Sequence, residues 1–206
     1  MPRAPGDQPT AAQRVLATAG ELFYRQGARA VGVDEIVAKA GTTKPSLYRA
    51  FGSKDQLIAA CLEDQAARLW SDLEAAFEAH AGDPRAQILS CFEVTAGQAG
   101  CKTNRGCALS NALVEFPEPK HPGHRVALGH KEAMRKRLRD LTRSMDARKP
   151  KKLADGLFLL MEGAFITQQI FGEDGPAGAA RGAAEALIEA HTRRDLGVTP
   201  QEGATG

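Results

Sequence analysis

Side chains that can bind phosphate are concentrated between residues 43 and 54. Three are cationic and three carry a hydroxyl, and they stand at Thr43, Lys44, Ser46, Tyr48, Arg49 and Lys54. Cationic and hydroxyl side chains supply many of the contacts that proteins make to the sugar-phosphate backbone of DNA. The cluster therefore indicates binding of a polyanion, with the N-terminus of a helix adding its N–H groups and partial positive charge.

The charge distribution points to the same part of the chain. The formal net charge is +2, and residues 1–60 contain 8 Lys or Arg against 5 Asp or Glu, whereas residues 61–206 contain 19 against 20. A basic N-terminal unit on a near-neutral body is compatible with nucleic-acid binding. A difference of this size also occurs in many enzymes, so the charge alone does not assign a function.

Two short predicted helices position the cluster. The first extends from about Val33 to Ala40, and the second follows Thr43 and ends near Phe51, with Ala40-Gly41-Thr42-Thr43 between them. A turn of this length that contains glycine is typical of a helix-turn-helix, whose second helix enters the major groove. The spacing alone equally allows a helical hairpin with a solvated polar face.

The rest of the chain is also predicted to be helical. β-Branched residues are scattered, and no Asn-Gly or Asp-Gly turn joins two apolar runs. We expect an all-α fold of about nine helices, with a loop at 116–123 because its prolines cannot continue a helix, and a last helix that begins at Pro176. The expected organisation is a flexible arm at 1–9, a DNA-binding domain at 10–56 with its helix-turn-helix at about 33–52, a ligand-binding and dimerisation domain at 57–195, and a disordered tail at 196–206.

The amino-acid sequence of the helix-turn-helix segment resembles that of a known family. Residues 33–57, VDEIVAKAGTTKPSLYRAFGSKDQL, resemble the N-terminal domain of the tetracycline-repressor (TetR) family of bacterial regulators, and ATAGELFYRQG at residues 17–27 is similar to that family's first helix. The resemblance covers residues 10–65 through several separated matches, such as Ala-Gly after the second helix and Leu-Tyr-x-x-Phe in the third. It implies a three-helix DNA-binding head, a larger helical ligand-binding body and a homodimer.

The resemblance also assigns DNA contacts to particular residues of the cluster. Gly32 departs from the family pattern, because many members have Ser or Thr there, and the capping hydroxyl and its phosphate contact are lost. Pro45 replaces a commoner small residue and should stiffen the first turn of the reading helix without blocking it. The contacts implied by the resemblance are Thr43, Lys44, Ser46, Tyr48 and Lys54.

In the body, the resemblance implies a homodimer interface formed by helices at about 152–172 and 176–194. The first segment carries more apolar side chains than one neighbouring helix needs, and the second has small residues suited to close helix approach. Packing within one chain is the alternative explanation.

An effector pocket is expected between the fourth and eighth helices of the chain. For each candidate lining residue, core packing is the alternative, while Asn111 and Glu162 stand out because polar groups in an apolar cavity fix the orientation of a ligand. The candidates are Trp70, Phe77, Phe92, Cys107, Asn111, Met134, Leu138, Phe158, Glu162, Phe165 and Gln169.

Cys107 has a second interpretation as a redox site. It follows Arg105-Gly106 and lies near Lys102 and Cys101, and cationic neighbours or a helix N-terminus favour a thiolate. The segment RGCAL at 105–109 resembles the region that holds a reactive thiol in TetR-family repressors that sense electrophiles and hypochlorite. Cys107, with Cys101 as a second candidate, is therefore a potential sensor, and a small buried core residue is the alternative.

Metal binding and catalysis are less well supported by the sequence. His121, His124 and His130 are potential ligands, but no Cys-x-x-Cys or His-x-x-x-His pair exists, so no metal site is expected. Cys107 and His130 are the nucleophile and base to consider for an enzyme, yet nothing places them together and no Gly-rich phosphate loop is present. We expect neither enzymatic activity nor a cofactor.

The expected function is that of a ligand-responsive repressor that binds a pseudo-palindromic double-stranded operator as a homodimer and is released by a small-molecule effector. The alternatives are a cysteine-based redox- or electrophile-sensing repressor, an activator or structural DNA-binding protein, and, more remotely, an enzyme or a ligand-binding protein without DNA affinity. The chain has no apolar run long enough to span a bilayer and no secretory signal, so a cytoplasmic protein with reduced thiols and no membrane partner is expected.

Overall fold

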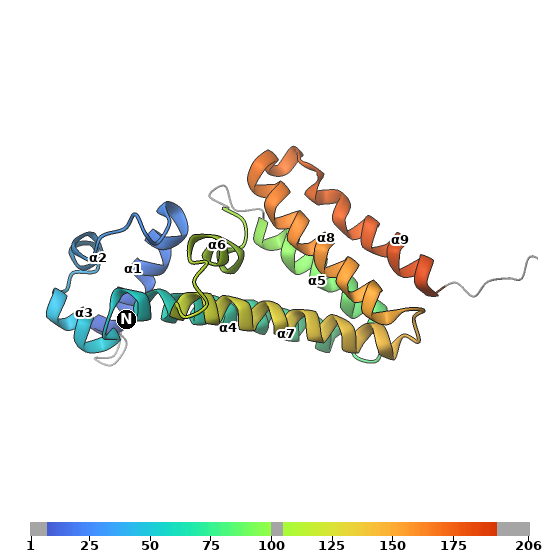
Figure 1. Ribbon diagram of the computed structural model, residues 1–206, viewed down its shortest axis with the longest axis horizontal. Helices are drawn as coiled ribbons and strands as arrows, with labels where there is room; N and C mark the ends of the chain where they lie inside the picture. Colours follow the sequence, from blue (N-terminus) through green and yellow to red (C-terminus); the bar gives the residue numbers. More distant parts are fainter. Residues whose placement is uncertain (1–7, 100–104, 193–206) are drawn as a thin grey trace, which may run out of the picture.

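The computed structural model describes residues 8–99 and 105–192, and every regular element within these ranges is helical. Nine α-helices and two short 3₁₀ turns follow one another along this part of the chain (Figure 1). Their bounds are α1 Ala11–Gln26, α2 Val33–Lys39, α3 Lys44–Phe51, α4 Lys54–Ala79, α5 Pro84–Ala99, α6 Ala108–Glu115, α7 Pro122–Ser144, α8 Pro150–Phe171, η1 Gly172–Asp174, η2 Pro176–Ala179 and α9 Ala180–Thr192. The predicted all-α fold is confirmed.

Helices α1, α2 and α3 and the first turns of α4 form a head at one end of the molecule (Figure 1). The Thr10 hydroxyl accepts a hydrogen bond from the Gln13 N–H, and the Gln13 side chain accepts one from the Thr10 N–H, so the predicted capping box is present. Helices as short as α2 and α3 are not stable alone and depend on the apolar core that they share with α1 and α4. The buried members of this core are Val15, Ala19, Leu22, Val31, Ile36, Val37, Ala40, Leu47 and Leu57.

Arg14 fastens α1 to the turn between α2 and α3. Its Nε donates to the carbonyl oxygen of Ala40 at 3.1 Å, and its Nη2 donates to that of Gly41 at 3.3 Å. A third bond joins its Nη1 to the carbonyl oxygen of Pro9 at 3.0 Å. Because the guanidinium is planar and its donors are fixed relative to one another, these bonds set the distance of the turn from α1.

Helix α4 begins in the head and continues into the body, where it packs along α7 (Figure 1). Helices α5 and α8 pack on this pair, α9 packs on α8 and α5, and α6 lies between them and the head (Figure 1). Across the residues that the structure describes, none of the helices combines the length and hydropathy required to cross a membrane. The main body core consists of Leu69, Leu73, Phe77, Ile88, Leu89, Cys91, Phe92, Met134, Leu138, Leu141, Ala147, Leu153, Ala154, Leu157, Met161, Ala184 and Ile188.

Two helix boundaries differ from the sequence prediction. The loop expected at 116–123 is shorter, since α7 already begins at Pro122, in the first turn, where the missing N–H of proline costs no hydrogen bond. His121 caps this helix by accepting a hydrogen bond from the Gly123 N–H at 3.1 Å. Pro176 begins a 3₁₀ turn rather than the last α-helix, which begins at Ala180, because the segment tightens into the short helical form common at α-helix termini.

Candidate nucleic-acid interface and interior cavities

The local sequence fixes α3 at both its N-terminus and its buried side. The Thr43 Oγ1 accepts a hydrogen bond from the Ser46 N–H at 3.4 Å, and the two hydroxyl oxygens lie 3.1 Å apart. Pro45 occupies the first turn, and Leu47 is fully buried in the head core. Because Leu47 anchors one side of the helix, the other side is left to solvent. The exposed side chains on that side include Lys44, Tyr48 and Arg49.

The two cationic side chains of α3 have different partners. Lys44 Nζ lies 2.7 Å from Asp34 Oδ1 of α2, and this hydrogen bond raises the pKa of Lys44 above its ordinary value. Arg49 forms neither an ion pair nor a hydrogen bond with any residue in the described ranges. Exposed ion pairs are weak, so a phosphate group can replace Asp34 as the partner of Lys44 and can supply the partner that Arg49 lacks.

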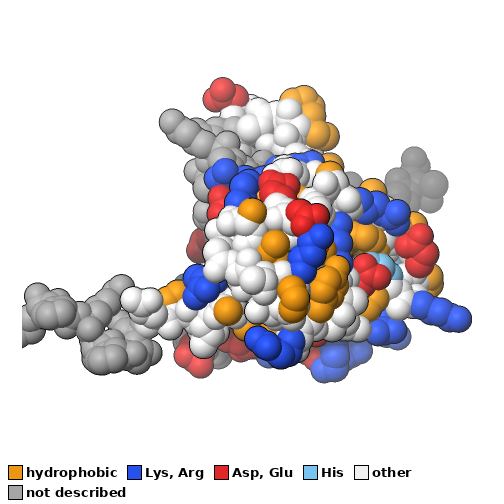
Figure 2. Space-filling view, turned by 90° about the vertical axis from the view of Figure 1, so that its left-hand side faces the viewer, with side chains coloured by type: hydrophobic (Ala, Val, Ile, Leu, Met, Phe, Trp, Pro, Cys, Tyr) orange, Lys and Arg blue, Asp and Glu red, His pale blue; other side chains and the backbone are white. Residues whose placement is uncertain are grey.

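Tyr48 and Lys54 complete the predicted cluster. The side chain of Tyr48 is 44% exposed, and Lys54 Nζ of α4 donates to the carbonyl oxygen of Arg29 at 3.5 Å. Figure 2 views this end of the molecule and shows Lys and Arg side chains spread over it, with hydrophobic and acidic side chains between them. We call this face the reading surface, and define it by Thr43, Lys44, Ser46, Tyr48, Arg49 and Lys54.

Gly32 precedes α2 and gives a first testable prediction. Its backbone is extended (φ −82°, ψ 150°), α2 has no side-chain cap, and no atom lies within 4 Å of a Cβ placed at this position. Gly32→Ser is therefore expected to stabilise the head by about 0.5–1 kcal/mol, because serine adds a capping acceptor and restricts the unfolded chain. Thermal unfolding of the two proteins measures the change, and an unchanged or lower unfolding temperature would contradict the structure at this cap.

Glu115 and Arg29 join the head to the body. The Glu115 carboxylate accepts hydrogen bonds from the Ala28 N–H at 3.1 Å and the Arg29 N–H at 2.5 Å, directly after α1. In return, Arg29 Nε donates to the Glu115 carbonyl oxygen at 2.9 Å. The end of α6 is thereby attached to the end of α1 by hydrogen bonds in both directions.

A second connection lies at the start of α6. The Tyr24 hydroxyl donates to the carbonyl oxygen of Gly106 at 3.1 Å and accepts from the Arg105 N–H at 2.7 Å. The Arg105 guanidinium donates to the carbonyl oxygens of Tyr24 and Arg25, in the last turn of α1. These partners are 80 to 82 positions apart in the chain, so no local sequence pattern predicts that they meet.

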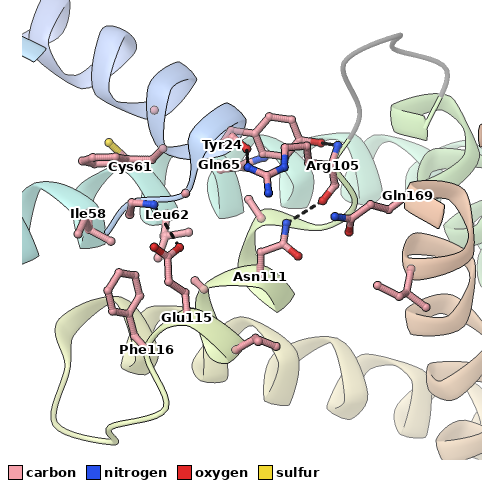
Figure 3. A pocket seen from close by; sticks show the side chains of 18 residues that line it. Tyr24, Ile58, Cys61, Leu62, Gln65, Arg105, Asn111, Glu115, Phe116 and Gln169 are labelled. Carbon is pink, nitrogen blue, oxygen red and sulfur yellow. Dashed lines mark hydrogen bonds between the residues drawn. The ribbon is translucent and has the colours of Figure 1, made fainter. Parts of the chain in front are cut away.

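A cavity of about 410 Å³ lies between these two connections, and we call it the junction cavity. Its walls come from α1 of the head and from α4, α6 and α8 of the body (Figure 3). Of the residues predicted to line an effector pocket, Asn111 and Gln169 line this cavity. The Asn111 Nδ2 donates to the Arg105 carbonyl oxygen at 2.7 Å, which fixes its amide (Figure 3).

A second cavity, of about 320 Å³, lies in the body between α5, α8 and the segment 177–181. Phe92 and Phe165 from the predicted set line it. Met134, Glu162 and Phe165 border a narrow void of about 10 Å³. The candidate residues therefore do not line a single pocket. Some line one of the two cavities, and the remaining aromatic and aliphatic candidates belong to the body core. These core residues are Trp70, Phe77, Leu138 and Phe158, with Phe77 and Leu138 almost completely buried.

Lys131 brings two of the predicted residues together in the interior. Its Nζ lies 2.6 Å from Glu162 Oε1 and 3.4 Å from the Cys107 Sγ, and only 12% of its side chain is exposed. Ser110 donates to the other Glu162 oxygen at 2.8 Å. Gly106, just before Cys107, allows this segment to pack closely against α8. Its φ is +72°, and an added Cβ would lie 2.9 Å from Gln169 Oε1. Cys107 is therefore a buried thiol beside an ammonium group.

His130 adjoins this group and is also buried. Its ring centroid lies 5.5 Å from that of Trp70, and its Nδ1 has no hydrogen-bond partner within the described parts of the chain. Burial, together with the neighbouring Lys131, lowers the pKa of His130 to about 4, although Glu162 acts in the opposite direction. The imidazole is consequently neutral in the folded protein at neutral pH.

Cys61, Cys91 and His121 take part in packing. Burial raises the pKa of Cys61 and of Cys91 to about 12, which keeps both as unreactive thiols. Cys101, the second redox candidate, lies outside the described residues. The His121 ring stacks on Phe116 at 4.1 Å. In the ranges 8–99 and 105–192, no group of three His, Cys, Asp or Glu side chains is arranged to hold a metal ion.

Comparison with known proteins assigns the chain to a family. The family described as bacterial regulatory proteins, tetR family, matches residues 15–61. The transcriptional activator FasR from Mycolicibacterium smegmatis is 44% identical over 50 residues, 24% of this chain and 23% of FasR. The curated relatives that match are covered over 23–54% of their own length.

Solved structures extend the similarity to the whole described chain. The TetR-family regulator SCO4454 from Streptomyces coelicolor has 28% identity and a TM-score of 0.84, with 89% of this chain and 96% of that one covered. The tetR-type transcriptional regulator sav143 from Streptomyces avermitilis has 30% identity and a TM-score of 0.80, with coverage of 90% and 100%. The predicted family is confirmed, and the chain belongs to the tetR family of bacterial regulatory proteins.

Proposed function

We propose that the protein is a DNA-binding transcriptional repressor that acts as a homodimer and responds to a small-molecule effector. The observation that carries the proposal is the reading surface, on which α3 is anchored by Leu47 and presents Lys44, Tyr48 and Arg49 to solvent. A helix presented in this way fits the major groove, while Lys54 at the start of α4 reaches the backbone. The name of FasR describes an activator, so the direction of regulation is part of the proposal.

The proposed dimer interface is the outer face of α8 and α9. Leu159, Ile166 and Ile170 are 70%, 49% and 63% exposed and follow one stripe of α8. The neighbouring α9 exposes a stripe of small side chains at Ala183, Ala186 and Ala190. Large side chains on one helix and small ones on the next suit a four-helix packing with a second copy. Such a dimer would present two reading helices about one turn of DNA apart.

The proposal predicts the effect of two substitutions on the reading surface. An operator is first selected from fragments of the source genome at about 150 mM salt, where non-specific phosphate binding is weak. Lys44→Ala is expected to lower operator affinity about tenfold or more and to reduce the dependence of affinity on salt, because it removes a charged phosphate contact from each protomer. Tyr48→Phe should lower affinity less, by removal of one hydroxyl donor, with the dimer intact.

Lys136→Ala is the matched control for Lys44→Ala. Lys136 is an exposed lysine of α7 that also pairs with an aspartate, Asp140, at 2.9 Å, but it lies in the body. Fluorescence anisotropy with labelled operator measures all variants. Operator affinity that is unchanged in both Lys44→Ala and Tyr48→Phe would show that α3 is not the reading helix.

A second candidate function rests on the distance of 3.4 Å between Cys107 Sγ and Lys131 Nζ. As a thiolate, Cys107 can add to the β-carbon of an unsaturated carbonyl while a proton is transferred to the α-carbon. Under this hypothesis an electrophile modifies Cys107 and the modified protein leaves its operator.

Alkylation by N-ethylmaleimide tests the electrophile hypothesis. Cys107 is expected to react at least about tenfold faster than Cys61 and Cys91, whose thiols have a raised pKa. Mass spectrometry after tryptic cleavage at Arg105 separates the peptides of Cys101 and Cys107. The same treatment should release operator from the wild type and not from Cys107→Ser, with Cys91→Ser as the control. Equal alkylation of all thiols, or release from Cys107→Ser, would reject the hypothesis.

A further inference from the structure

We propose that the junction cavity binds a small amphipathic carboxylate, with an apolar body and one anionic end. Its volume of about 410 Å³ lies within the range of small-molecule sites in proteins. The cavity differs from the pocket expected within the body, because residues 20–28 of the head form part of its wall. The expected effect of this ligand on DNA binding rests on the proposed function, whereas binding of the ligand to the cavity does not.

One side of the cavity is apolar. Phe23 from α1, Ile58 and Leu62 from α4, and Phe116 after α6 line it, and Figure 3 shows the last three gathered on the same side. Ile58, Leu62 and Phe116 are themselves buried, so these walls are already formed. Apolar surface of this kind favours a hydrocarbon chain or a ring over a hydrated polar ligand.

The opposite side is polar and includes the guanidinium group of Arg105. Gln65, Asn111 and Gln169 present amide groups there, and Figure 3 places them around Arg105. Arg105 donates to the carbonyl oxygens of Tyr24 and Arg25 but forms no ion pair with a carboxylate of the described residues. A guanidinium surrounded by neutral amides is a site for one carboxylate group.

The single acidic residue that lines the described part of the cavity does not oppose this assignment. Both Glu115 oxygens accept backbone hydrogen bonds, from Ala28 and Arg29. Figure 3 shows the Glu115 carboxylate on the apolar side near Leu62 and Phe116, away from Arg105. Its charge is thus compensated at the head, and it offers no oxygen to a cationic ligand without loss of these bonds.

A ligand in this position would contact the head and the body at once. Its binding free energy therefore depends on the orientation of α1 relative to α6. A ligand that favours one orientation of the head shifts the protein toward it, and this difference in binding free energy sets the change in operator affinity. The coupling is reciprocal, so operator DNA must change the affinity for the ligand by the same factor.

Calorimetric titration of the full chain without DNA tests the binding. The probes are octanoate, octan-1-ol and octyltrimethylammonium, which share the hydrocarbon chain and differ in the charge of the end group. Octanoate is expected to bind once per protomer and at least about tenfold more tightly than octanol, and the cationic probe is expected not to bind. Equal affinity for all three probes, or no binding of octanoate, would overturn the assignment.

Three variants locate the site. Arg105→Gln should weaken octanoate binding about tenfold and leave octanol unaffected, whereas Arg105→Lys should retain most of the affinity for octanoate. Gly20→Leu should weaken both probes, because a Cβ at Gly20 has room, with its nearest neighbour, Cys61 Sγ, at 4.0 Å, and the longer side chain enters the cavity. Arg25→Gln is the control, as this arginine pairs with Glu21 and does not line the cavity.

The outcomes separate this inference from the proposed function. Circular dichroism confirms that each variant is folded before titration, and unchanged octanoate binding in both Arg105→Gln and Gly20→Leu rejects the junction cavity even if operator binding is normal. Octanoate binding that both variants weaken supports the site even if no operator can be selected, in which case it is the regulator proposal that fails.

Discussion

Simultaneous replacement of Leu159 and Ile170 by glutamate is expected to convert the proposed dimer to monomers and to lower operator affinity about 100-fold or more. Both side chains are exposed on α8, at 70% and 63%, and line neither the junction cavity nor the cavity between α5 and α8. In the proposed interface the two carboxylates would be buried without partners, which costs far more than the apolar contacts that they replace. Loss of the dimer then removes the gain that comes from binding two half-sites together.

Sedimentation equilibrium and anisotropy on the same samples measure the two effects. Leu128→Glu is the control, because Leu128 is an exposed leucine of α7, 42% exposed, that lies on another surface. The control should remain dimeric with normal operator affinity. A Leu159→Glu/Ile170→Glu protein that is still dimeric would exclude α8 as the interface, and a monomer with full operator affinity would exclude the cooperative binding of two half-sites.

Acid is expected to destabilise the protein through His130. Burial lowers the pKa of this imidazole to about 4, whereas its value in the unfolded chain is about 6.5. Between these two values the unfolded state binds a proton that the folded state does not, so the stabilisation present above pH 6.5 is lost as the pH falls toward 4. The loss attributable to His130 is at most about 3 kcal/mol over this interval and does not increase further below pH 4.

His130→Leu isolates this contribution. The variant removes the titrating group and the buried Nδ1 that has no partner in the described structure, so its unfolding free energy should fall less between pH 6.5 and pH 4 than that of the wild type. Urea unfolding at several pH values gives the difference between the two curves. Parallel curves would show that His130 is protonated equally well in the folded and unfolded states.

The elements of the head were predictable because their signals are local. Thr10 and Thr43 each cap a backbone N–H within one helical turn. The structure contains the capping box of Thr10 with Gln13 and the proline of the first turn after Thr43, Pro45. The reading surface followed from the same short segment. The start of α7 at Pro122 was not predicted, because a proline is tolerated in the first turn of a helix as well as in a loop. The sequence does not distinguish the two positions.

The junction could not be predicted in the same way. Its bonds join residues 80 or more positions apart, and several use backbone groups, which carry no residue-specific signal. The expected effector pocket was drawn from aromatic and polar residues of the body, so it omitted the wall that α1 contributes. Asn111 is visible in the sequence as a polar residue in an apolar segment, while the contribution of Phe23 depends on how the head docks against the body.

The way Glu115 and Arg105 hold the head has a consequence for evolution and for engineering. Both residues bind main-chain atoms of the head, at Ala28, Arg29, Tyr24 and Arg25, and main-chain atoms are the same in every homologous helix. A head with another operator preference could therefore replace this one without redesign of most of the attachment, provided that its helix ends in the same geometry and keeps an aromatic hydroxyl at position 24. Hybrid regulators, in which this body is joined to foreign heads, are a direct use of that interchangeability.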